Sequence, residues 1–155
     1  LGWYLAQSPE ALHQVPNLVR ALEGDPIQIL FGGPPFRIEP VEPLLLTSKL
    51  AVSIHLTWTK YPSRNVALLD VMTRGCSKGA ALALWAHRCG VGAREVMAIG
   101  DNFNDLEMLQ FAGLPVLMGN HSPGFGHDTW RVTLPNDQDG VAAAIQAYVL
   151  NQPAA

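Results

Sequence analysis

The sequence is poor in charge and contains no cluster of basic residues. Charged residues make up 15% of the 155 residues, and the formal net charge is −3. A protein that binds the phosphate backbone of a nucleic acid needs a basic patch or stripe, so this composition argues against such a partner. The sequence also lacks an apolar run of the roughly 20 residues that a membrane-spanning helix needs. We therefore expect neither a nucleic-acid partner nor a membrane partner.

Cysteine is scarce as well. The two cysteines, Cys76 and Cys89, are not accompanied by a Cys or His cluster at the spacing of a zinc site. This favours two free thiols in a reducing compartment. Residues 1–4 show no basic leader of a secretory signal, so we expect a cytoplasmic protein. Hydrophobic residues, in contrast, make up 48% of the chain, which is enough to build a packed core.

Short apolar runs alternate with helical segments in the second half of the chain. We expect strands at residues 96–99, 115–118 and 131–134, and helices at residues 78–89, 105–111 and 140–150. Ser77 is the expected N-cap of the first of these helices, and Gly90 its stop. Strands that alternate with helices indicate βαβ units. The pattern therefore predicts an α/β fold with a parallel sheet and helices on both faces.

The first half is less regular and predicts a small α+β module with an antiparallel sheet. Strands are expected at residues 27–31, 52–58 and 66–72, and a helix at residues 44–50. Another helix should begin at Ser8, stop at Pro16 and resume over residues 18–22. Residues 32–43 are rich in Pro and Gly, which indicates a loop or linker. We divide the chain into two domains, residues 1–72 and 73–155.

Two carboxylates four residues apart follow the strand expected at residues 96–99. Asp101 would project from the strand end, and Asp105 from the turn or first helical turn after it. Ligands of open α/β sheets bind at this end of the strands. Carboxylate oxygens suit Mg²⁺, which takes one or two protein carboxylates and keeps several waters. Taken alone, the pair could also be a loop acid and a helix-capping acid.

Lys78 is an unusual residue for the start of a helix. The helix macrodipole favours anions at that end, so a cation there is slightly unfavourable. A lysine at this place can instead join backbone N–H groups in holding a phosphate. Gly79 would let the backbone come close. The alternative is a lysine exposed on the surface without a special role.

The order of these motifs resembles the haloacid dehalogenase (HAD) superfamily of hydrolases. It is most similar to the branch of Cof-type sugar-phosphate phosphatases with a C2 cap, in its C-terminal part only. The resemblance covers about residues 69–147 and rests on Ser77-Lys78-Gly79, Gly100-Asp101-Asn102-Phe103-Asn104-Asp105, Met118-Gly119-Asn120 and the tail at residues 136–142. It implies that residues 73–155 form the C-terminal half of a HAD-like Rossmannoid core. Residues 1–72 would then be a partial α+β cap of the C2 type.

The resemblance implies a role for each matched site residue. Lys78 would neutralise the nucleophile and the phosphoryl oxygens, Asp101 would bind Mg²⁺ directly, and Asp105 would act on the metal or its waters. Asn104 and Asn120 would contact the phosphate together with Lys78, or fix the loop. Lys78, Asp101 and Asp105 are thus the expected catalytic residues. The implied activity is Mg²⁺-dependent hydrolysis of small phosphorylated metabolites.

The family's nucleophile motif, Asp-x-Asp at the end of the first core strand, is not found before residue 70. Asp137-Gln138-Asp139 has the same spelling, but it opens the last helix, where acids that cap the helix are the better interpretation. We therefore expect weak Mg²⁺ binding and no catalysis by this chain alone, and whether it is an enzyme stays open.

Two other functions remain as alternatives. The first is a non-catalytic HAD-like protein that binds or oligomerises, with a homodimer formed through an exposed sheet edge. The second is a dinucleotide-binding domain, which is weaker because no Gly-x-Gly-x-x-Gly follows an expected strand.

Overall fold

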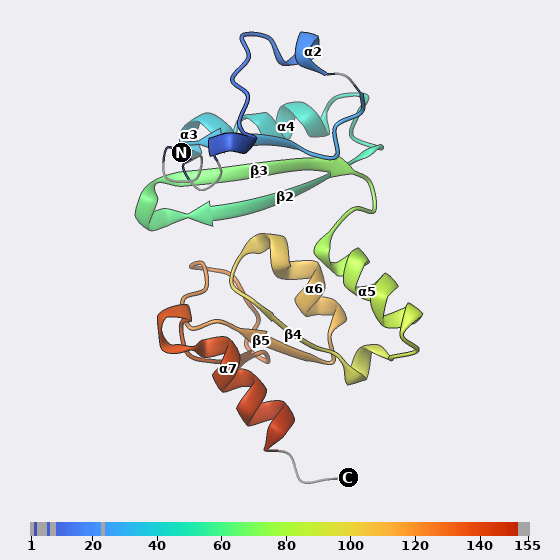
Figure 1. The fold of residues 1–155 in the computed structure, drawn as a ribbon, viewed down its shortest axis with the longest axis vertical. Coiled ribbons are helices and arrows are strands. Elements are labelled where there is room, and N and C mark those ends of the chain that lie inside the picture. The colour runs from blue at the N-terminus through green and yellow to red at the C-terminus, as the bar shows by residue number, and fades with distance from the viewer. Residues whose placement is uncertain (1, 3–5, 7–8, 23, 152–155) are drawn as a thin grey trace. The chain divides into compact units, whose positions relative to one another are not determined.

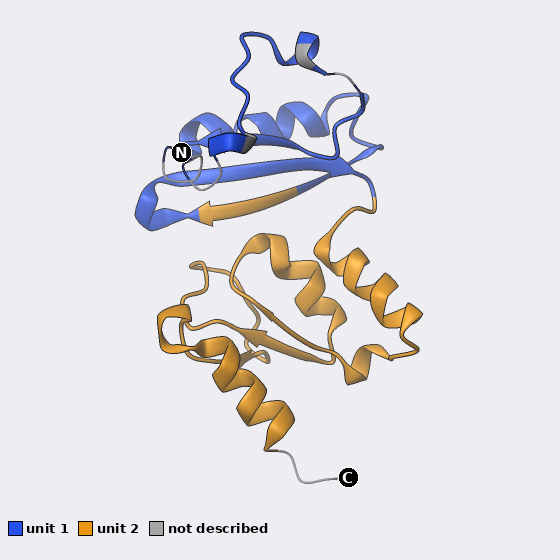
Figure 2. Ribbon diagram, in the orientation of Figure 1, with its two compact units in different colours: residues 1–56, 61–74 blue, residues 57–60, 75–155 orange. Residues whose placement is uncertain are grey.

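The computed structural model describes residues 2, 6, 9–22 and 24–151, and the chain divides into two compact units. Unit 1 comprises residues 1–56 and 61–74, and unit 2 comprises residues 57–60 and 75–155 (Figure 2). The sequence placed a domain boundary between residues 72 and 73. The identity of these regions as a partial cap and half of a core stays a prediction.

Unit 1 is organised around a three-stranded sheet in the order β1-β3-β2 (Figure 1). Strand β1 (Ile29–Gly33) runs antiparallel to β3 (Val66–Thr73), and β2 (Ile54–Tyr61) lies at the other edge. The predicted antiparallel pairing is therefore confirmed for β1 and β3. Because β3 is the central strand, it supplies most of the buried hydrophobic side chains of this unit, namely Val66, Ala67, Leu68 and Leu69.

Two helices occupy the segment that the sequence predicted to be a loop. Helix α3 spans Pro35–Ile38 and α4 spans Val41–Leu46, so the loop prediction for residues 32–43 is wrong. Pro35 is the first residue of α3, and Pro40 is the N-cap of α4. The first backbone N–H groups of a helix have no partner within the helix. Proline, which has no backbone N–H, therefore loses no hydrogen bond there and is favoured. The prolines therefore mark helix starts, not a linker.

Short helical turns precede β1. Residues Pro9–Ala11 form a 3₁₀ turn, and α2 covers Leu18–Ala21. Asn17 caps α2, because its Oδ1 accepts a hydrogen bond from the backbone N of Arg20 at 3.3 Å. The predicted helix start at Ser8 lies outside the described residues.

Unit 2 contains the predicted parallel sheet, with strands in the order β4-β5-β6. Strand β4 (Met97–Gly100) pairs parallel with β5 (Leu114–Leu117), and β5 pairs parallel with β6 (Arg131–Val132). The α/β architecture expected from the alternating pattern is thus confirmed. Strand β6 is only two residues long and shorter than predicted.

Helices α5, α6 and α7 accompany this sheet (Figure 1). Helix α5 spans Lys78–Arg88, α6 spans Leu106–Phe111, and α7 spans Gly140–Ile145 before continuing as a π-helical turn. Ser77 is the N-cap of α5, as predicted, and Gly90 follows the helix with a φ of 69°. Glycine adopts this left-handed conformation at no steric cost, so the helix ends there.

The core of unit 2 lies where α6 packs on β4 and β5. Leu109 of α6 is completely buried, and burial of such a side chain stabilises the fold by roughly 1.5–3 kcal/mol. The buried residues of this cluster are Ala98, Leu109, Ala112, Leu117 and Phe125. Because α6 is anchored on the sheet, its first turn is held at the carboxyl end of β4.

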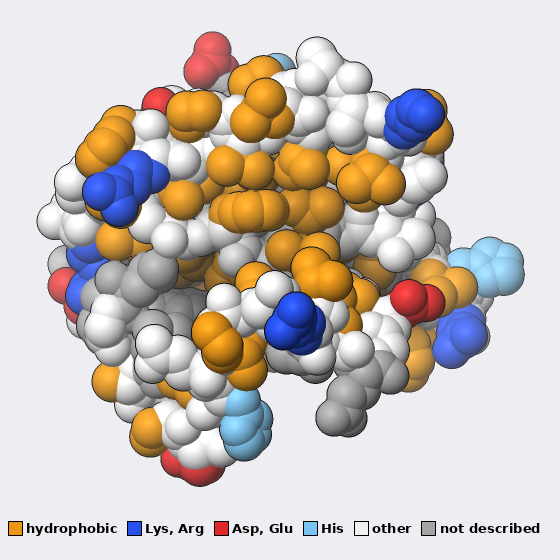
Figure 3. Space-filling view, turned by 90° about the horizontal axis from the view of Figure 1, so that it is seen from above, with side chains coloured by type: hydrophobic (Ala, Val, Ile, Leu, Met, Phe, Trp, Pro, Cys, Tyr) orange, Lys and Arg blue, Asp and Glu red, His pale blue; other side chains and the backbone are white. Residues whose placement is uncertain are grey.

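Unit 1 exposes several large hydrophobic side chains. Phe36 on α3 and Leu44 on α4 are each 69% exposed, and Leu50 is 57% exposed. Figure 3 shows hydrophobic side chains gathered on the face of the molecule that it views.

Among the described residues, none of the helices combines the length and the apolar character that crossing a membrane requires.

Candidate functional site

The candidate site is built on the loop that joins β4 to α6. Residues Phe103–Asp105 form a 3₁₀ turn, and Asn102 caps it by accepting a hydrogen bond from Phe103 N at 2.9 Å. Asp105 closes the loop from the other end. Its Oδ2 accepts hydrogen bonds from the backbone N of Asp101 at 3.0 Å and of Asn102 at 3.2 Å. The loop therefore folds back so that the Asp105 carboxylate lies against the backbone of Asp101.

Lys78 meets this loop from the first residue of α5. Its Nζ lies 2.5 Å from Oδ1 of Asp105, in an ion pair. The Asp105 side chain is 6% exposed, whereas the Lys78 side chain is 51% exposed. The ammonium group is therefore fixed by a buried carboxylate while half of its side chain remains open to solvent. The structure thus brings together the lysine and the acid that the sequence motifs singled out.

Both carboxylate oxygens of Asp105 are used within the protein. One bonds Lys78, and the other accepts the two backbone N–H groups of the loop. Oδ2 already accepts two hydrogen bonds, whereas Oδ1, which accepts one from Lys78, keeps a second acceptor site. The metal role expected for Asp105 stays a prediction, and the geometry of the described residues supports a positioning role.

Asp101 has the more available carboxylate. Its Oδ2 accepts a long hydrogen bond from Nδ2 of Asn120, at 3.5 Å. Burial raises the pKa of Asp101 above its ordinary value of 3.8, and the nearby Asp105 carboxylate raises it further, while Lys78 acts in the opposite direction. A cation bound to Asp101 would favour the ionised carboxylate, because an opposite charge stabilises it.

The donor set fits part of a magnesium site. Carboxylate oxygens are hard ligands, and Mg²⁺ needs only one or two of them beside waters and substrate phosphate. Within the described part of the chain, no group of three or more His, Cys, Asp or Glu side chains could hold a metal ion. These residues therefore supply a fraction of a coordination shell, with Asp101 as its best-placed member.

The two predicted amide residues differ in their surroundings. Asn120 follows β5 and bridges two segments, since its Oδ1 accepts a hydrogen bond from Asn136 N at 2.8 Å while its Nδ2 faces Asp101. Asn104 lies in the 3₁₀ turn and is half-buried. Asn120 is thus brought to the carboxylate of Asp101, and the phosphate contacts expected of both amides stay predictions.

Two glycines allow the close packing that forms the site. A Cβ at Gly100 would lie 2.6 Å from Cβ and 2.9 Å from Cγ of Asp105. A Cβ at Gly79 would lie 2.5 Å from Cβ of Glu107, on the first turn of α6. Ser77 Oγ also donates a hydrogen bond to Glu107. Gly79 therefore brings the start of α5 against α6, and this contact sets Lys78 beside Asp105.

Sequence reasoning missed Asn102 and Lys60. Asn102 is 6% exposed, and its side chain pairs with the backbone of Lys60 at both ends, accepting from N at 3.0 Å and donating to O at 2.9 Å. Asn is a preferred N-cap residue, so the capping role of Asn102 could have been predicted. Lys60 lies 42 residues away, and its contact involves backbone atoms that no side-chain pattern marks.

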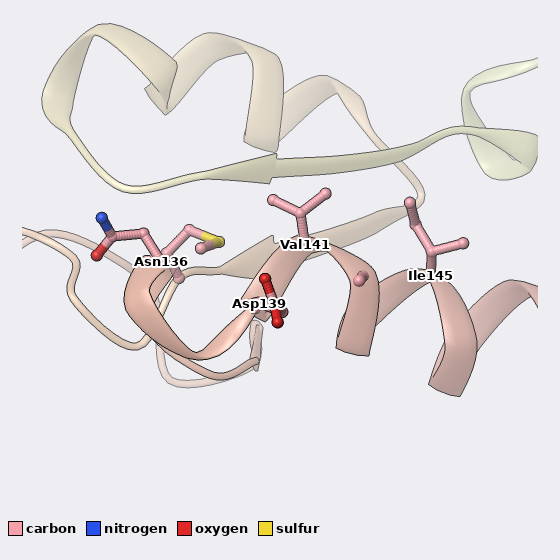
Figure 4. Close-up of a pocket in the computed structure, with 7 residues that line it drawn as sticks. Asn136, Asp139, Val141 and Ile145 are labelled. Atoms are coloured by element: carbon pink, nitrogen blue, oxygen red, sulfur yellow. The ribbon is translucent and has the colours of Figure 1, made fainter.

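The Asp137-Gln138-Asp139 triplet lies at the start of α7 and not at a strand end. Asp137 and Asp139 are exposed, and Asp139 has a φ of 55°. Asp139 is the N-cap residue of α7, but its side chain makes no capping hydrogen bond, so the capping prediction holds for its position only. Asp139 lines a surface pocket of about 370 Å³ together with Asn136, Val141 and Ile145, which are labelled in Figure 4.

Comparison with known proteins identifies the family. The sequence matches the haloacid dehalogenase-like hydrolases over residues 46–145. It is 40% identical over 82 residues to the 5-amino-6-(5-phospho-D-ribitylamino)uracil phosphatase YcsE of Bacillus subtilis, covering 53% of this chain and 33% of that protein. It is 41% identical over 84 residues to the stress response protein YhaX of the same species, covering 54% of this chain and 29% of that protein.

Solved structures share the fold. A haloacid dehalogenase-like hydrolase from Bacteroides thetaiotaomicron aligns with a TM-score of 0.65 and 30% identity, covering 87% of this chain and 48% of that one. The HAD subclass IIB sugar phosphatase BT4131 aligns with a TM-score of 0.60 and 28% identity, covering 71% and 40%. This chain spans about a third of the length of the two Bacillus relatives and less than half of these two structures. The predicted HAD-like α/β fold is confirmed, and the chain belongs to the haloacid dehalogenase-like hydrolase family.

Proposed function

We propose that this chain carries the magnesium- and phosphate-binding part of a phosphatase that acts on small phosphorylated metabolites. The family and the relatives named as phosphatases support the reaction class. The observation that carries the proposal is the ion pair between Lys78 Nζ and Asp105 Oδ1, at 2.5 Å, next to the loop of Asp101. This ion pair holds a half-exposed ammonium group next to the loop that carries Asp101, whose carboxylate suits a hard cation.

Each residue has a distinct role in this proposal. Asp101 holds Mg²⁺, which when bound supplies positive charge that polarises the phosphoryl group. Lys78 binds phosphoryl oxygens with its ammonium group, as charge-assisted hydrogen bonds to phosphate require. Asp105 orients Lys78 and the loop and acts on the metal indirectly. Asn104 and Asn120 contact the phosphate or fix the loop around it.

We further propose that this chain alone does not hydrolyse phosphate esters. The one Asp-x-Asp of the sequence, residues 137–139, lies in the turn before α7. This motif therefore does not supply a nucleophile at the end of a strand, where the reaction would need it. The exposed free thiols of Cys76 and Cys89 support a reducing, cytoplasmic location.

The alternative function is a binding or oligomerising protein. Strand β4 lies at one edge of the β4-β5-β6 sheet in the described residues, and an edge strand can pair with a second copy. The two functions differ in what they require of Lys78 and Asp101. Phosphate binding needs both residues, whereas dimerisation through β4 needs neither.

Titration calorimetry with inorganic phosphate, in the presence and absence of Mg²⁺, tests the proposal. We expect Mg²⁺-dependent binding by the wild-type chain, its loss in Lys78→Ala and in Asp101→Ala, and no change in Lys49→Ala, which removes an exposed lysine of unit 1. Hydrolysis of para-nitrophenyl phosphate should stay at background. A homodimer in light scattering without phosphate binding would overturn the proposal in favour of the alternative.

A further inference from the structure

Lys60 places an ammonium group over two aromatic rings in unit 2. Its Nζ lies 5.4 Å from the centroid of the Trp58 ring and 5.5 Å from that of Phe103. The residue is half-buried, and within the described residues no carboxylate forms an ion pair with it. The charge of Lys60 is therefore compensated by ring faces and not by a counter-ion.

The backbone of Lys60 is attached to the site loop on both sides. Asn102 accepts from its N at 3.0 Å and donates to its O at 2.9 Å, and Ser122 Oγ donates to the same O at 3.3 Å. Asn102 and Ser122 are each 6% exposed, so these bonds are shielded from water. Ser122 N in turn donates to the backbone O of Asp101 at 2.8 Å. Lys60 is thereby fixed on the loop that carries Asp101.

This arrangement prepares the ammonium group for an anion. A half-buried cation loses part of its favourable hydration free energy, and the interaction with the ring faces compensates for only part of that loss. A ligand carboxylate or phosphate would compensate for more of it, through a charge-assisted hydrogen bond. Because the Lys60 backbone is already ordered by Asn102 and Ser122, binding would cost little further conformational entropy.

We propose that Lys60 is a specificity-determining residue that binds a second anionic group of the substrate. The preferred substrates would then be phosphate esters whose alcohol part carries a carboxylate or another phosphate, in place of neutral alcohols. This inference rests on the proposed function, since the first anionic group is the phosphoryl group held by Lys78. A purely structural role for Lys60 would change stability without changing the choice of ligand.

Two ligands of matched size separate these roles. 3-Phosphoglycerate has a carboxylate where glycerol 3-phosphate has a neutral hydroxymethyl group. Titration calorimetry with Mg²⁺ should show that the wild-type chain binds 3-phosphoglycerate about tenfold more tightly, the ratio expected of one charge-assisted hydrogen bond. Lys60→Met should abolish this preference and leave binding of glycerol 3-phosphate unchanged. Lys60→Arg should retain the preference, and the control Lys49→Met should behave as wild type.

Several outcomes would overturn the inference. Equal binding of both ligands by the wild-type chain would contradict it, as would a Lys60→Met variant that loses affinity for both ligands to the same extent. In either case, binding that still depends on Lys78 and Asp101 leaves the proposed function standing. If neither ligand binds, or if Lys78→Ala binds both as wild type does, the proposed function fails and this inference fails with it.

Discussion

The polar side chains buried at the end of β4 in unit 2 have very different surroundings from the hydrophobic side chains exposed on α4 and nearby in unit 1. Unit 2 buries Asn102, Asp105 and Ser122 around the end of β4, where each makes hydrogen bonds to backbone groups. Unit 1 leaves large hydrophobic side chains such as Leu44 and Val52 each 69% exposed. Buried polar groups tolerate little change because an unpaired group loses its hydration without compensation. The comparison therefore predicts that substitutions near the β4–α6 loop are costly, whereas those on exposed positions of unit 1 are tolerated.

The largest effect is expected from Gly100→Ala. The new Cβ would lie 2.6 Å from Cβ of Asp105, which is closer than van der Waals contact allows, so the strand end or the buried aspartate must shift. We expect the free energy of unfolding, measured by urea denaturation, to fall by about 3 kcal/mol, as overpacking of a tight site does. Gly24→Ala in unit 1 is the matched control, since no atom lies within 4 Å of its Cβ. Similar losses in the two variants would break the comparison.

Asn102→Ala should have the next largest effect. It leaves the backbone N of Lys60 without its side-chain partner, removes one of the two side-chain donors to Lys60 O, and removes the cap on Phe103 N. We expect a loss of about 2 kcal/mol in the free energy of unfolding, because buried groups are left unpaired. Hydrogen exchange of the Lys60 amide should become faster in the variant. An unchanged exchange rate would show that Asn102 does not hold this segment.

The helix caps of the two units allow a paired test. Ser77 Oγ accepts from Ala80 N at 3.0 Å at the start of the eleven-residue helix α5, whereas Asn17 caps the four-residue helix α2. Ser77→Ala should lower the free energy of unfolding by about 1 kcal/mol. Asn17→Ala should lower it by less, because α2 is short and its residues with described side chains are exposed. Thermal unfolding followed by circular dichroism measures both, and a larger loss in Asn17→Ala would contradict the comparison.

The smallest effect is expected from Leu44→Ser. The side chain is 69% exposed on α4, so the substitution removes little buried apolar area. The free energy of unfolding should change by less than about 0.5 kcal/mol, which is the usual range for exposed positions. A loss above that range in chemical denaturation would show that Leu44 is covered in solution and that unit 1 is less open than described.

Much of unit 2 could be predicted from its sequence. Apolar runs bounded by Gly and Asn indicated β4 and β5, and Ser77 with Gly90 bounded α5. The closeness of Lys78 and Asp105 also followed from the order of motifs, because the ends of parallel strands and the starts of their helices meet at one edge of the sheet. The bounds of these strands and of α5 depend on chemistry within a few residues along the chain, whereas the contact of Lys78 with Asp105, 27 positions apart, follows from the topology.

The remaining features depend on information that is not local. Residues 32–43 were predicted to be a loop because proline is a turn signal, and only the exact helix register shows that Pro35 is a first helical residue. The two hydrogen bonds between the Asn102 side chain and the Lys60 backbone join residues that are 42 positions apart. Backbone groups are the same at every position, so no residue pattern could reveal this contact.

The most direct test of the central claim is a crystal structure of the chain grown with Mg²⁺ and phosphate. We expect a cation in contact with the carboxylate of Asp101 and a phosphate oxygen within hydrogen-bond distance of Lys78 Nζ, with the Lys78–Asp105 pair retained. Phosphate bound away from Lys78, or a site near Asp101 that stays empty at saturating concentrations of both ions, would contradict it.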